Sequence, residues 1–491
     1  MLSVSGARGI VGASMTPTVA AEFAAAFASH LISSSPPPSP SSSSSTPPSA
    51  PAPLIIVGRD SRPSGDMLQC AAVAGLLATG CRVLRLGIVP TPTVGLLIDE
   101  HRAAGGLVLT ASHNPAPWNG LKCLIASSTG SGCAPPAALA RAIIERFTAK
   151  NFAYAPVERM HKPSKADNAA EIHVARVLAH VDVAAIRAQR FKVLLDSCNG
   201  AGGHAGALLL SELNCDLVHL NAAPTGHFAH APEPTRENLA DLSAQARTHR
   251  AQVAFAQDPD ADRLAIVDDT GSYIGEEYTL VLAALALLDD ARLRTSSSGA
   301  TGGLPASAAS PLTLAANLST SRMLDDVAAR SGARVIRTAV GEANVVEAML
   351  AHSCLLGGEG NGGVIWPAVC LVRDSLSAMA LTLQLMARKQ KSLSQICSEI
   401  PAYAIEKAKI DLKPDTDMAR ILDAVQRDIG GPASSNRSDG LRLDFAAQRA
   451  WVHVRPSNTE PIVRVIAEAP SAAAARALVE NALSVVKRAT A

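Results

Sequence analysis

The chain has 491 residues, of which 48% are hydrophobic and 3% aromatic, and its formal net charge is +1. This length is typical of about three or four domains, while the near-zero charge and the few aromatic rings argue against a nucleic acid or an anionic membrane as partner. The nine cysteines include no CxxC pair, which argues against a disulfide framework or a structural zinc site and favours a cytoplasmic location.

The first predicted element is a helix over the apolar run 19–32. The run contains Glu22 and His30 and follows no basic leader, which argues against a signal peptide. The apolar stretch 280–288 is too short to cross a bilayer, so we expect no membrane segment. Residues 33–53 hold ten Ser and eight Pro in 21 positions, a composition that predicts a disordered insert rather than a folded element.

Three later segments share one pattern, starting at Leu54, Phe191 and Leu312. Each has a short apolar strand, a polar turn, an amphipathic helix and a second strand, which predicts three repeated α/β domains with mixed, helix-covered sheets. From about residue 402 the pattern changes to a smaller α+β domain. We expect its strands at 441–445, 450–454 and 462–467 and its helix at 472–488, and we expect loops at 296–310 and 430–440.

The predicted domain boundaries follow from these patterns. They are residues 1–157, 158–276, 277–388 and 400–491.

Two motifs carry the strongest chemical signal. In LTASHNP, the apolar strand 106–110 leads directly to Ser112, His113 and a turn-forming Asn-Pro, although a plain strand and turn would look the same. In DPDADR, the alternating Asp258, Asp260 and Asp262 lie between two apolar strands and can converge on a hard cation such as Mg²⁺. An EF-hand is excluded because Arg263 stands where that loop needs Gly, whereas a solvated acidic turn remains an alternative.

Two further motifs predict ligand binding. GGEGNGG places Glu359 and Asn361 among glycines, which lets the backbone approach a ligand whose hydroxyls these side chains can bind. The segment 454–465 concentrates donors that suit a phosphate, although a basic surface turn is the alternative; they are Arg455, Ser457, Asn458, Thr459 and Arg464. Arg8 and Lys122 alone are weak signals.

Taken together and in this order, the motifs resemble those of the α-D-phosphohexomutase family, over nearly the whole chain outside the insert and two other loops. The resemblance implies four domains around a central cleft, in a monomer or homodimer that acts on hexose phosphates. It implies a phosphorylated Ser112, one Mg²⁺ held by Asp258, Asp260, Asp262 and a phosphoserine oxygen, and sugar recognition by Glu359, Asn361 and Gly341. It also implies that His113, Lys122, Arg8 and Arg263 surround the reacting phosphate.

The implied reaction interconverts hexose 6- and 1-phosphates through a hexose 1,6-bisphosphate, with Lys122 as a candidate proton acceptor. The GEGNGG form favours a phosphoglucosamine mutase, with phosphomannomutase or phosphoglucomutase as the alternative. The chain departs from many relatives at three positions: Gly363 and Glu342 stand where some have His, and Ala339 where others have Lys. The general acid/base therefore stays unassigned.

Two other classes of function are weaker alternatives. A sugar-phosphate-binding protein without turnover would not need Ser112 and all three aspartates. A serine hydrolase built on Ser112 and His113 lacks the GxSxG elbow, and adjacent residues rarely reach nucleophile–base geometry.

Overall fold

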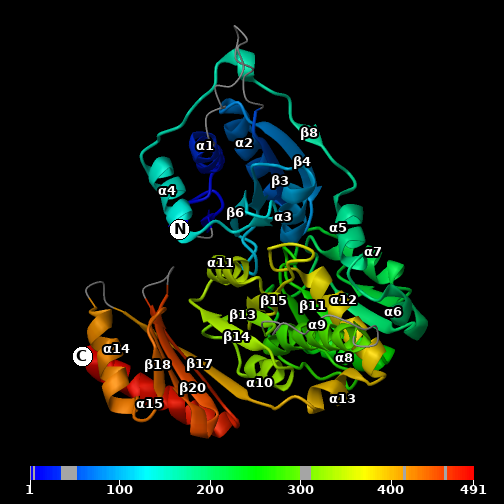
Figure 1. Ribbon diagram of the computed structural model, residues 1–491. Helices are drawn as coiled ribbons and strands as arrows, with labels where there is room; N and C mark the ends of the chain where they lie inside the picture. Colours follow the sequence, from blue (N-terminus) through cyan, green and yellow to red (C-terminus); the bar gives the residue numbers. More distant parts are fainter. Residues whose placement is uncertain are drawn as a thin grey trace. The chain divides into compact units, whose positions relative to one another are not determined.

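The structure, a computed structural model of the chain, describes residues 2–3, 6–34, 52–298, 311–412, 416–457 and 462–490. It divides into two compact units. The first unit comprises residues 1–276 and 363–390, and the second comprises residues 277–362 and 391–491. Figure 1 follows the helices and strands along the chain.

The first unit begins with a mixed sheet in which eight described strands take part, in the order β1-β2-β6-β5-β3-β4-β8 with β7 beside β6. β3, β4 and β5 are parallel, and β6 runs antiparallel to β5. The strands are β1 Leu2–Ser3, β2 Gly6–Ile10, β3 Leu54–Arg59, β4 Arg82–Ile88, β5 Gly105–Leu109, β6 Trp118–Ala126, β7 Gly132–Cys133 and β8 Ser164–Lys165.

Helices α1 Pro17–Ser34, α2 Gly65–Ala78 and α4 Ala137–Thr148 share an apolar core with β3, β5 and β6, and α3 Thr91–Glu100 packs against β3 and β5. α1 and α2 approach closely at Gly75, where a Cβ atom would lie 2.1 Å from the carbonyl oxygen of Ala21. A side chain at Gly75 would therefore push the two helices apart.

The first unit continues with a second sheet in the order β10-β9-β11-β12, in which only β12 is antiparallel to its neighbour. Helix α12 packs against α5, α6 and α7 of this domain. The elements are α5 Ala169–Leu178, α6 Val183–Gln189, β9 Lys192–Asp196, α7 Gly203–Glu212, β10 Asp216–Leu220, α8 Ala240–His249, β11 Val253–Gln257, β12 Leu264–Val267, β16 Gly363–Ile365 and α12 Ser375–Lys389.

The second unit contains the parallel strands β14-β13-β15 and an antiparallel sheet in the order β17-β21-β20-β19-β18. Its first part has α9 Glu276–Ser298, β13 Thr313–Asn317, α10 Met323–Arg330, β14 Arg334–Thr338, α11 Glu342–His352, β15 Leu356–Glu359 and α13 Leu393–Ser398. Its second part has β17 Ala404–Asp411, α14 Met418–Ile429, β18 Ser434–Asn436, β19 Leu441–Phe445, β20 Ala450–Pro456, β21 Ile462–Ala469 and α15 Ala472–Thr490. α14 and α15 share an apolar core with one face of the antiparallel sheet. None of the described helices is both long and apolar enough to span a membrane.

The predicted architecture is confirmed: three α/β domains precede a smaller C-terminal domain with an antiparallel sheet. The three repeated patterns are β3-α2-β4, β9-α7-β10 and β13-α10-β14, and the first helix lies within α1. Three loop predictions need correction. Residues 33–34 continue α1, because Ser is tolerated in a last helical turn, and residues 296–298 continue α9. The segment 430–440 contains β18, which pairs with β19. Residues 35–51 and 299–310 lie outside the described residues, so their predicted conformations stay predictions.

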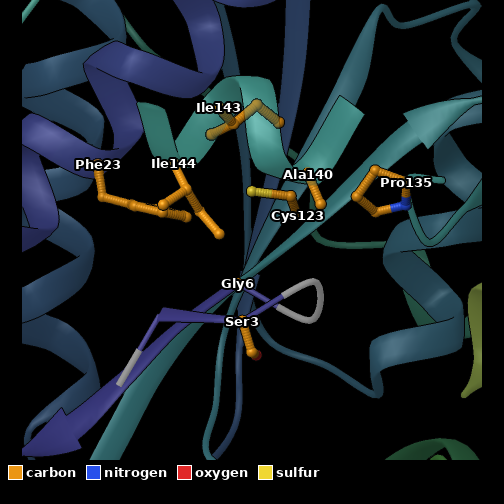
Figure 2. A pocket seen from close by; sticks show the side chains of 8 residues that line it. All are labelled: Ser3, Gly6, Phe23, Cys123, Pro135, Ala140, Ile143 and Ile144. Atoms are coloured by element: carbon orange, nitrogen blue, oxygen red, sulfur yellow. The ribbon is translucent and has the colours of Figure 1, made fainter. Parts of the chain in front are cut away.

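A small cavity in the first unit lies beneath α4 (Figure 2). Its lining is mainly apolar and includes Phe23, Cys123 and Ile143, and its volume is about 10 Å³. That volume holds about one water at most, so the cavity is a packing gap rather than a ligand site.

Candidate functional site

A short loop after β5 places the Ser112 side chain at a buried position, with 2% of its surface exposed. The residue has a left-handed backbone, with φ at +50°, a conformation that costs a non-glycine residue on the order of 1 kcal/mol. Its Oγ donates a hydrogen bond to Asp258 Oδ2 at 3.1 Å and lies 3.4 Å from His113 Nδ1. The turn therefore directs the hydroxyl towards the aspartate loop.

The side chain of Arg62 supports the loop that carries Ser112. The side chain is fully buried and donates from Nη2 to the carbonyl oxygens of Ser112 and Asn114, both at 2.7 Å, and from Nη1 to that of Pro115 at 2.9 Å. Its Nε donates to Asp60 Oδ2 at 3.0 Å. The planar guanidinium thus fixes the course of the backbone around Ser112 through three carbonyls.

The aspartate loop joins the antiparallel strands β11 and β12. Asp258, Asp260 and Asp262 are fully buried, and one oxygen from each lies within 4.8 Å of the others. Asp258 Oδ1 accepts from the backbone N–H groups of Asp262 and Arg263, and Asp260 Oδ2 accepts from Thr91 Oγ at 2.7 Å. These contacts hold the Asp258 carboxylate from the backbone and the Asp260 carboxylate from α3.

The three carboxylates fit a divalent cation. Asp260 Oδ1 and Asp262 Oδ1 are buried and have no hydrogen-bond partner among the described residues. Burial, and then the charges of Asp260 and Asp262, raise the pKa of Asp258 well above its usual value. Buried like charges at this spacing are costly unless a cation neutralises them, and oxygen-only ligands favour Mg²⁺ or a similar hard ion.

Two cationic side chains donate hydrogen bonds to the same oxygen of Asp262, Oδ2. Lys122 Nζ donates to Oδ2 at 3.2 Å from strand β6, and Arg373 Nη2 donates to the same atom at 2.6 Å. Burial alone would raise the pKa of Asp262, but Arg373, Lys122 and Arg263 together hold it well below its usual range. Asp262 is therefore ionised. Its Oδ2 contacts Lys122 and Arg373, which leaves Oδ1 for a cation bound by the three aspartates.

The remaining predicted groups of the first unit lie around this cluster. Arg8 Nη1 donates to Asn114 Oδ1 at 3.3 Å, and Arg263 Nε lies 3.7 Å from Asp262 Oδ1. Burial, followed by the charges of Arg263 and Arg8, lowers the pKa of His113 to about 3. The first unit thus brings together the predicted residues that surround Ser112: His113, Lys122, Arg8, Arg263 and the three aspartates.

The second unit contains the predicted sugar-binding residues. Glu359 ends β15 with 4% of its surface exposed, and its Oε1 accepts from Asn317 Nδ2 at 2.9 Å and from the backbone N–H of Gly341 at 3.2 Å. Gly341 has φ at +128°, which only glycine adopts easily. Asn361 Oδ1 is buried without a hydrogen-bond partner among the described residues, so a polar ligand atom could satisfy it.

Of the predicted phosphate residues, Arg455 and Arg464 lie on the face of the C-terminal sheet opposite α14 and α15. Arg455 on β20 is 6% exposed and its Nε lies 2.8 Å from Asp439 Oδ2. Arg464 on β21 is directly opposite Arg455 on one side and Lys409 on the other. The Ser457 backbone N–H donates to the Ile462 carbonyl oxygen at 2.9 Å. Asn458 and Thr459 lie outside the described residues.

This sheet face is also hollowed. A hollow of about 370 Å³ is lined by Lys407, Lys409 and Arg464 together with Ile462 and Ile466. Like charges placed directly opposite each other on a sheet are unfavourable, so the row of cations suits an anionic ligand.

Comparison with known proteins assigns the chain to a family. Models of the four domains of the phosphoglucomutase/phosphomannomutase family match in order: alpha/beta/alpha domains I, II and III at residues 2–154, 171–271 and 279–403, and the C-terminal domain at 408–484. The chain belongs to the α-D-phosphohexomutase family. It is thus a phosphohexomutase, an isomerase of sugar phosphates, as its motifs predict.

Individual phosphohexomutases match over nearly their whole length. A phosphoglucomutase/phosphomannomutase from Thermococcus kodakarensis is 35% identical over 488 residues, which cover 99% of this chain and 98% of that protein. A protein from Methanopyrus kandleri named "Probable phosphoglucosamine mutase" is 30% identical over 489 residues, which cover 99% and 97%. The crystal structure of a phosphoglucomutase/phosphomannomutase family protein from Burkholderia thailandensis shares the fold, with a TM-score of 0.80 and 24% identity over 100% of this chain and 98% of that chain.

The sequence did not indicate several residues that the structure places beside the Ser112 loop and the three aspartates. Arg62, Thr91 and Arg373 contact the serine loop or the aspartates from distant segments. The segment 59–62 reads Arg-Asp-Ser-Arg, which looks like a charged turn, and only burial distinguishes Arg62 from Arg59. The available sequence signal was a charged residue shortly after an apolar strand, and this pattern is too common to identify a functional residue.

Arg62 should be needed for turnover as well as for stability. Arg62→Lys keeps the charge but cannot contact three carbonyls at once. We expect kcat to fall by about 100-fold, because displacing a reacting group by about 1 Å lowers the rate by about this factor. We also expect the melting temperature to fall. Arg59→Lys, at the end of β3 three residues before Arg62 and paired with the exposed Asp66, is the control and should change neither. Equal, small effects of both changes would contradict a positioning role for Arg62.

Proposed function

We propose that Ser112 is the phosphate carrier of this phosphohexomutase. The observation that carries the proposal is the hydrogen bond from Ser112 Oγ to Asp258 inside the carboxylate cluster. Phosphoserine would give its phosphoryl group to a hydroxyl of a hexose phosphate: the P–O bond to Oγ breaks and a P–O bond to the sugar forms. The resulting hexose 1,6-bisphosphate then returns its other phosphate to Ser112, and the isomerised monophosphate leaves.

The charges of the first unit suit this transfer. Asp258, Asp260, Asp262 and a phosphoserine oxygen would hold Mg²⁺, which supplies charge neutralisation for the phosphoryl group when bound. Arg8 and Arg263 would bind the phosphoryl oxygens, and Lys122 Nζ, beside Asp262, would take the proton of the attacking hydroxyl when it is in its neutral amine form. His113, beside Ser112 Oγ, would orient the serine oxygen. Phosphoryl transfer asks the protein mainly for such alignment and electrostatic stabilisation.

The groups of the second unit suit the rest of the substrate. Glu359 and Asn361 would bind ring hydroxyls, with the Gly341 turn supporting Glu359. Arg455, Ser457, Asn458, Thr459 and Arg464 would bind the phosphate that is not transferred. The domain boundaries at about 157, 276 and 388–400, the cytoplasmic location and the monomeric or dimeric state also stay predictions.

For the sugar, we take glucose and mannose phosphates as the preferred substrates. The relative at 35% identity over almost the entire chain is a phosphoglucomutase/phosphomannomutase, and its name supports this choice. Glucosamine phosphate, which the GEGNGG loop favours, is the second candidate, supported by the relative at 30% identity.

One comparison of three substrates distinguishes the two candidates for the preferred sugar. Turnover of glucose 6-phosphate, mannose 6-phosphate and glucosamine 6-phosphate should be measured on one sample with added Mg²⁺, with and without hexose 1,6-bisphosphate. We expect kcat/KM to be at least about tenfold higher for the two neutral sugars, since one mismatched ring substituent costs about 1–3 kcal/mol, and the bisphosphate to stimulate turnover. Faster turnover of glucosamine 6-phosphate would select the second candidate, and no turnover of any of the three would refute the proposal.

A further inference from the structure

One carboxylate in the second unit contacts both groups of substrate-binding residues. Asp439 lies in the turn between β18 and β19, and its Oδ2 accepts a hydrogen bond from the Val340 backbone N–H at 3.0 Å. The same oxygen lies 2.8 Å from Arg455 Nε, and the side chain is 14% exposed. Val340 immediately precedes Gly341, whose N–H donates to Glu359. A short path of contacts thus runs from Glu359 through Gly341, Val340 and Asp439 to Arg455.

The backbone of the Asp439 turn is itself fixed. His453 is fully buried, and burial lowers its pKa to about 4, so the ring is neutral. Its Nε2 lies 2.6 Å from the Asp439 carbonyl oxygen and must be the protonated nitrogen, which leaves Nδ1 to accept from Ser319 Oγ at 2.9 Å. The turn therefore cannot shift without breaking its hydrogen bond to His453, whose ring is in turn bound by Ser319 in the loop that follows β13.

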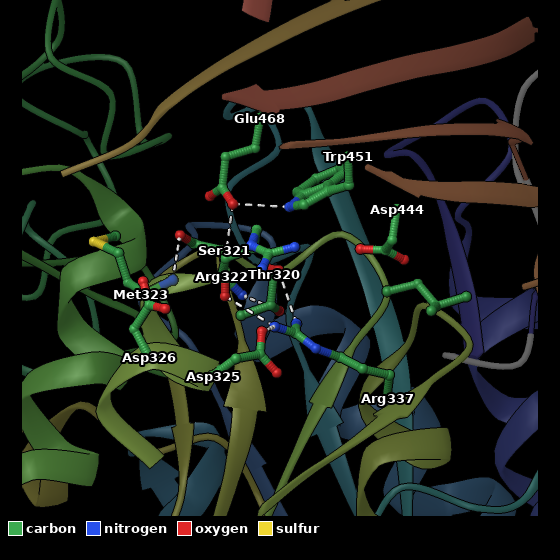
Figure 3. A network of polar contacts seen from close by, with 12 residues as sticks. Thr320, Ser321, Arg322, Met323, Asp325, Asp326, Arg337, Asp444, Trp451 and Glu468 are labelled. Atoms are coloured by element: carbon green, nitrogen blue, oxygen red, sulfur yellow. Dashed lines mark hydrogen bonds and ion pairs between the residues drawn. The ribbon is translucent and has the colours of Figure 1, made fainter. Parts of the chain in front are cut away.

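A second network joins that loop to the same sheet face (Figure 3). Glu468 Oε1 accepts from the Arg322 backbone N–H at 2.9 Å and from Trp451 Nε1 at 2.8 Å. Arg337 Nη2 donates to the Ser321 carbonyl oxygen at 3.0 Å. The loop around residues 317–323 and the sheet that carries Arg455 are therefore held together by contacts independent of Asp439, so changing Asp439 alone should not separate them.

The contact through Nε has a geometric consequence. At 2.8 Å the contact is an ion pair without hydrogen-bond geometry, and it anchors beside the Asp439 turn the guanidinium whose two Nη groups form the fork that binds a phosphate. Together with the anchored Val340, this sets the separation between the phosphate-binding fork and the hydroxyl-binding Glu359.

We infer that Asp439 is a positioning residue that fixes the distance between the Arg455 phosphate clamp and the Glu359 sugar-binding loop, and so selects hexose over shorter sugar phosphates. The inference rests on the proposed function of Arg455 and Glu359. It assigns Asp439 no direct contact with the substrate.

The test uses Asp439→Asn, which keeps an acceptor for the Val340 N–H and loses the charge beside Arg455. We expect KM for glucose 6-phosphate to rise about tenfold with kcat nearly unchanged, and the preference for glucose 6-phosphate over ribose 5-phosphate to fall. Calorimetric titration of the variant with glucose 6-phosphate should show the same loss of affinity. Asp423→Asn, which removes an exposed ion pair of the same domain, is the matched control and should leave these values as in the wild type.

Arg455→Lys, alone and combined with Asp439→Asn, provides the second measurement. If Asp439 acts through Arg455, the KM effect of the pair should be clearly smaller than the product of the single effects. Multiplicative effects, an unchanged KM, or a loss of kcat and melting temperature together would overturn the inference. Phosphorylation of wild-type Ser112 by a bisphosphate tests the proposed function separately, so the two can fail independently.

Discussion

Alanine in place of Ser112 should leave a folded protein that no longer interconverts hexose phosphates. The substitution removes the one oxygen that the account uses as phosphate carrier, and loss of a covalent nucleophile costs several orders of magnitude in kcat, here at least about 10³-fold. Stability should change little, because alanine meets the same left-handed backbone at φ +50° and gives up one hydrogen bond to Asp258. Initial rates with and without hexose 1,6-bisphosphate, together with a thermal unfolding curve, provide the measurement.

Ser127→Ala is the matched control. Ser127 lies in the turn after β6 and its Oγ is 2.8 Å from Thr129 Oγ, far along the chain from the aspartates. Its removal should leave the rate intact. A Ser112→Ala enzyme that keeps more than a tenth of the wild-type rate would show that the phosphate is carried elsewhere.

Asp260→Asn should abolish the response of the protein to Mg²⁺. In the wild type, the cation should raise the melting temperature, because it binds the folded cluster and not the unfolded chain. The variant has one ligand charge fewer, so this shift should vanish and kcat should fall by about 100-fold or more. Without metal, the variant should be more stable than the wild type by about 2 kcal/mol, since it relieves the repulsion of carboxylates that lie within 4.8 Å.

Unfolding curves in chelator and across a Mg²⁺ titration separate these effects without an activity assay. Asp241→Asn, an exposed carboxylate in the first turn of α8, should behave as the wild type in both. A metal-dependent shift that survives in Asp260→Asn, or a variant less stable than the wild type in chelator, would argue that the three aspartates do not share a cation.

Much of the fold and of the candidate site around Ser112 could be predicted because the sequence signals for them are local. The strand before Ser112 and the alternation of Asp258, Asp260 and Asp262 are continuous in sequence, and a loop between two strands brings such residues together wherever the domain lies. The repeated strand–helix–strand pattern is local in the same way. The edge strand β18 was missed because three polar residues, Ser434–Asn436, carry no apolar alternation and are strands only through pairing with β19.

The supporting residues could not be predicted because they arrive from distant segments. Arg373 lies 111 residues after Asp262, and Arg62 lies 50 residues before Ser112. In the sequence each resembles a solvated surface charge, the commonest state for arginine, and only the folded structure shows that it is buried. Asp439 is similar: its turn looks like an ordinary Asp-Gly hairpin, and its two partners are revealed only by the packing of the C-terminal sheet on the preceding domain.

The central claim is that one serine carries the phosphate between substrate molecules. Incubating the Mg²⁺-loaded protein with hexose 1,6-bisphosphate and mapping its proteolytic peptides by mass spectrometry tests this claim most directly. The peptide containing Ser112 should gain the mass of one phosphoryl group, and added hexose monophosphate should remove it again. Phosphate on another residue, or a modification of Ser112 that hexose monophosphate does not discharge, would contradict it.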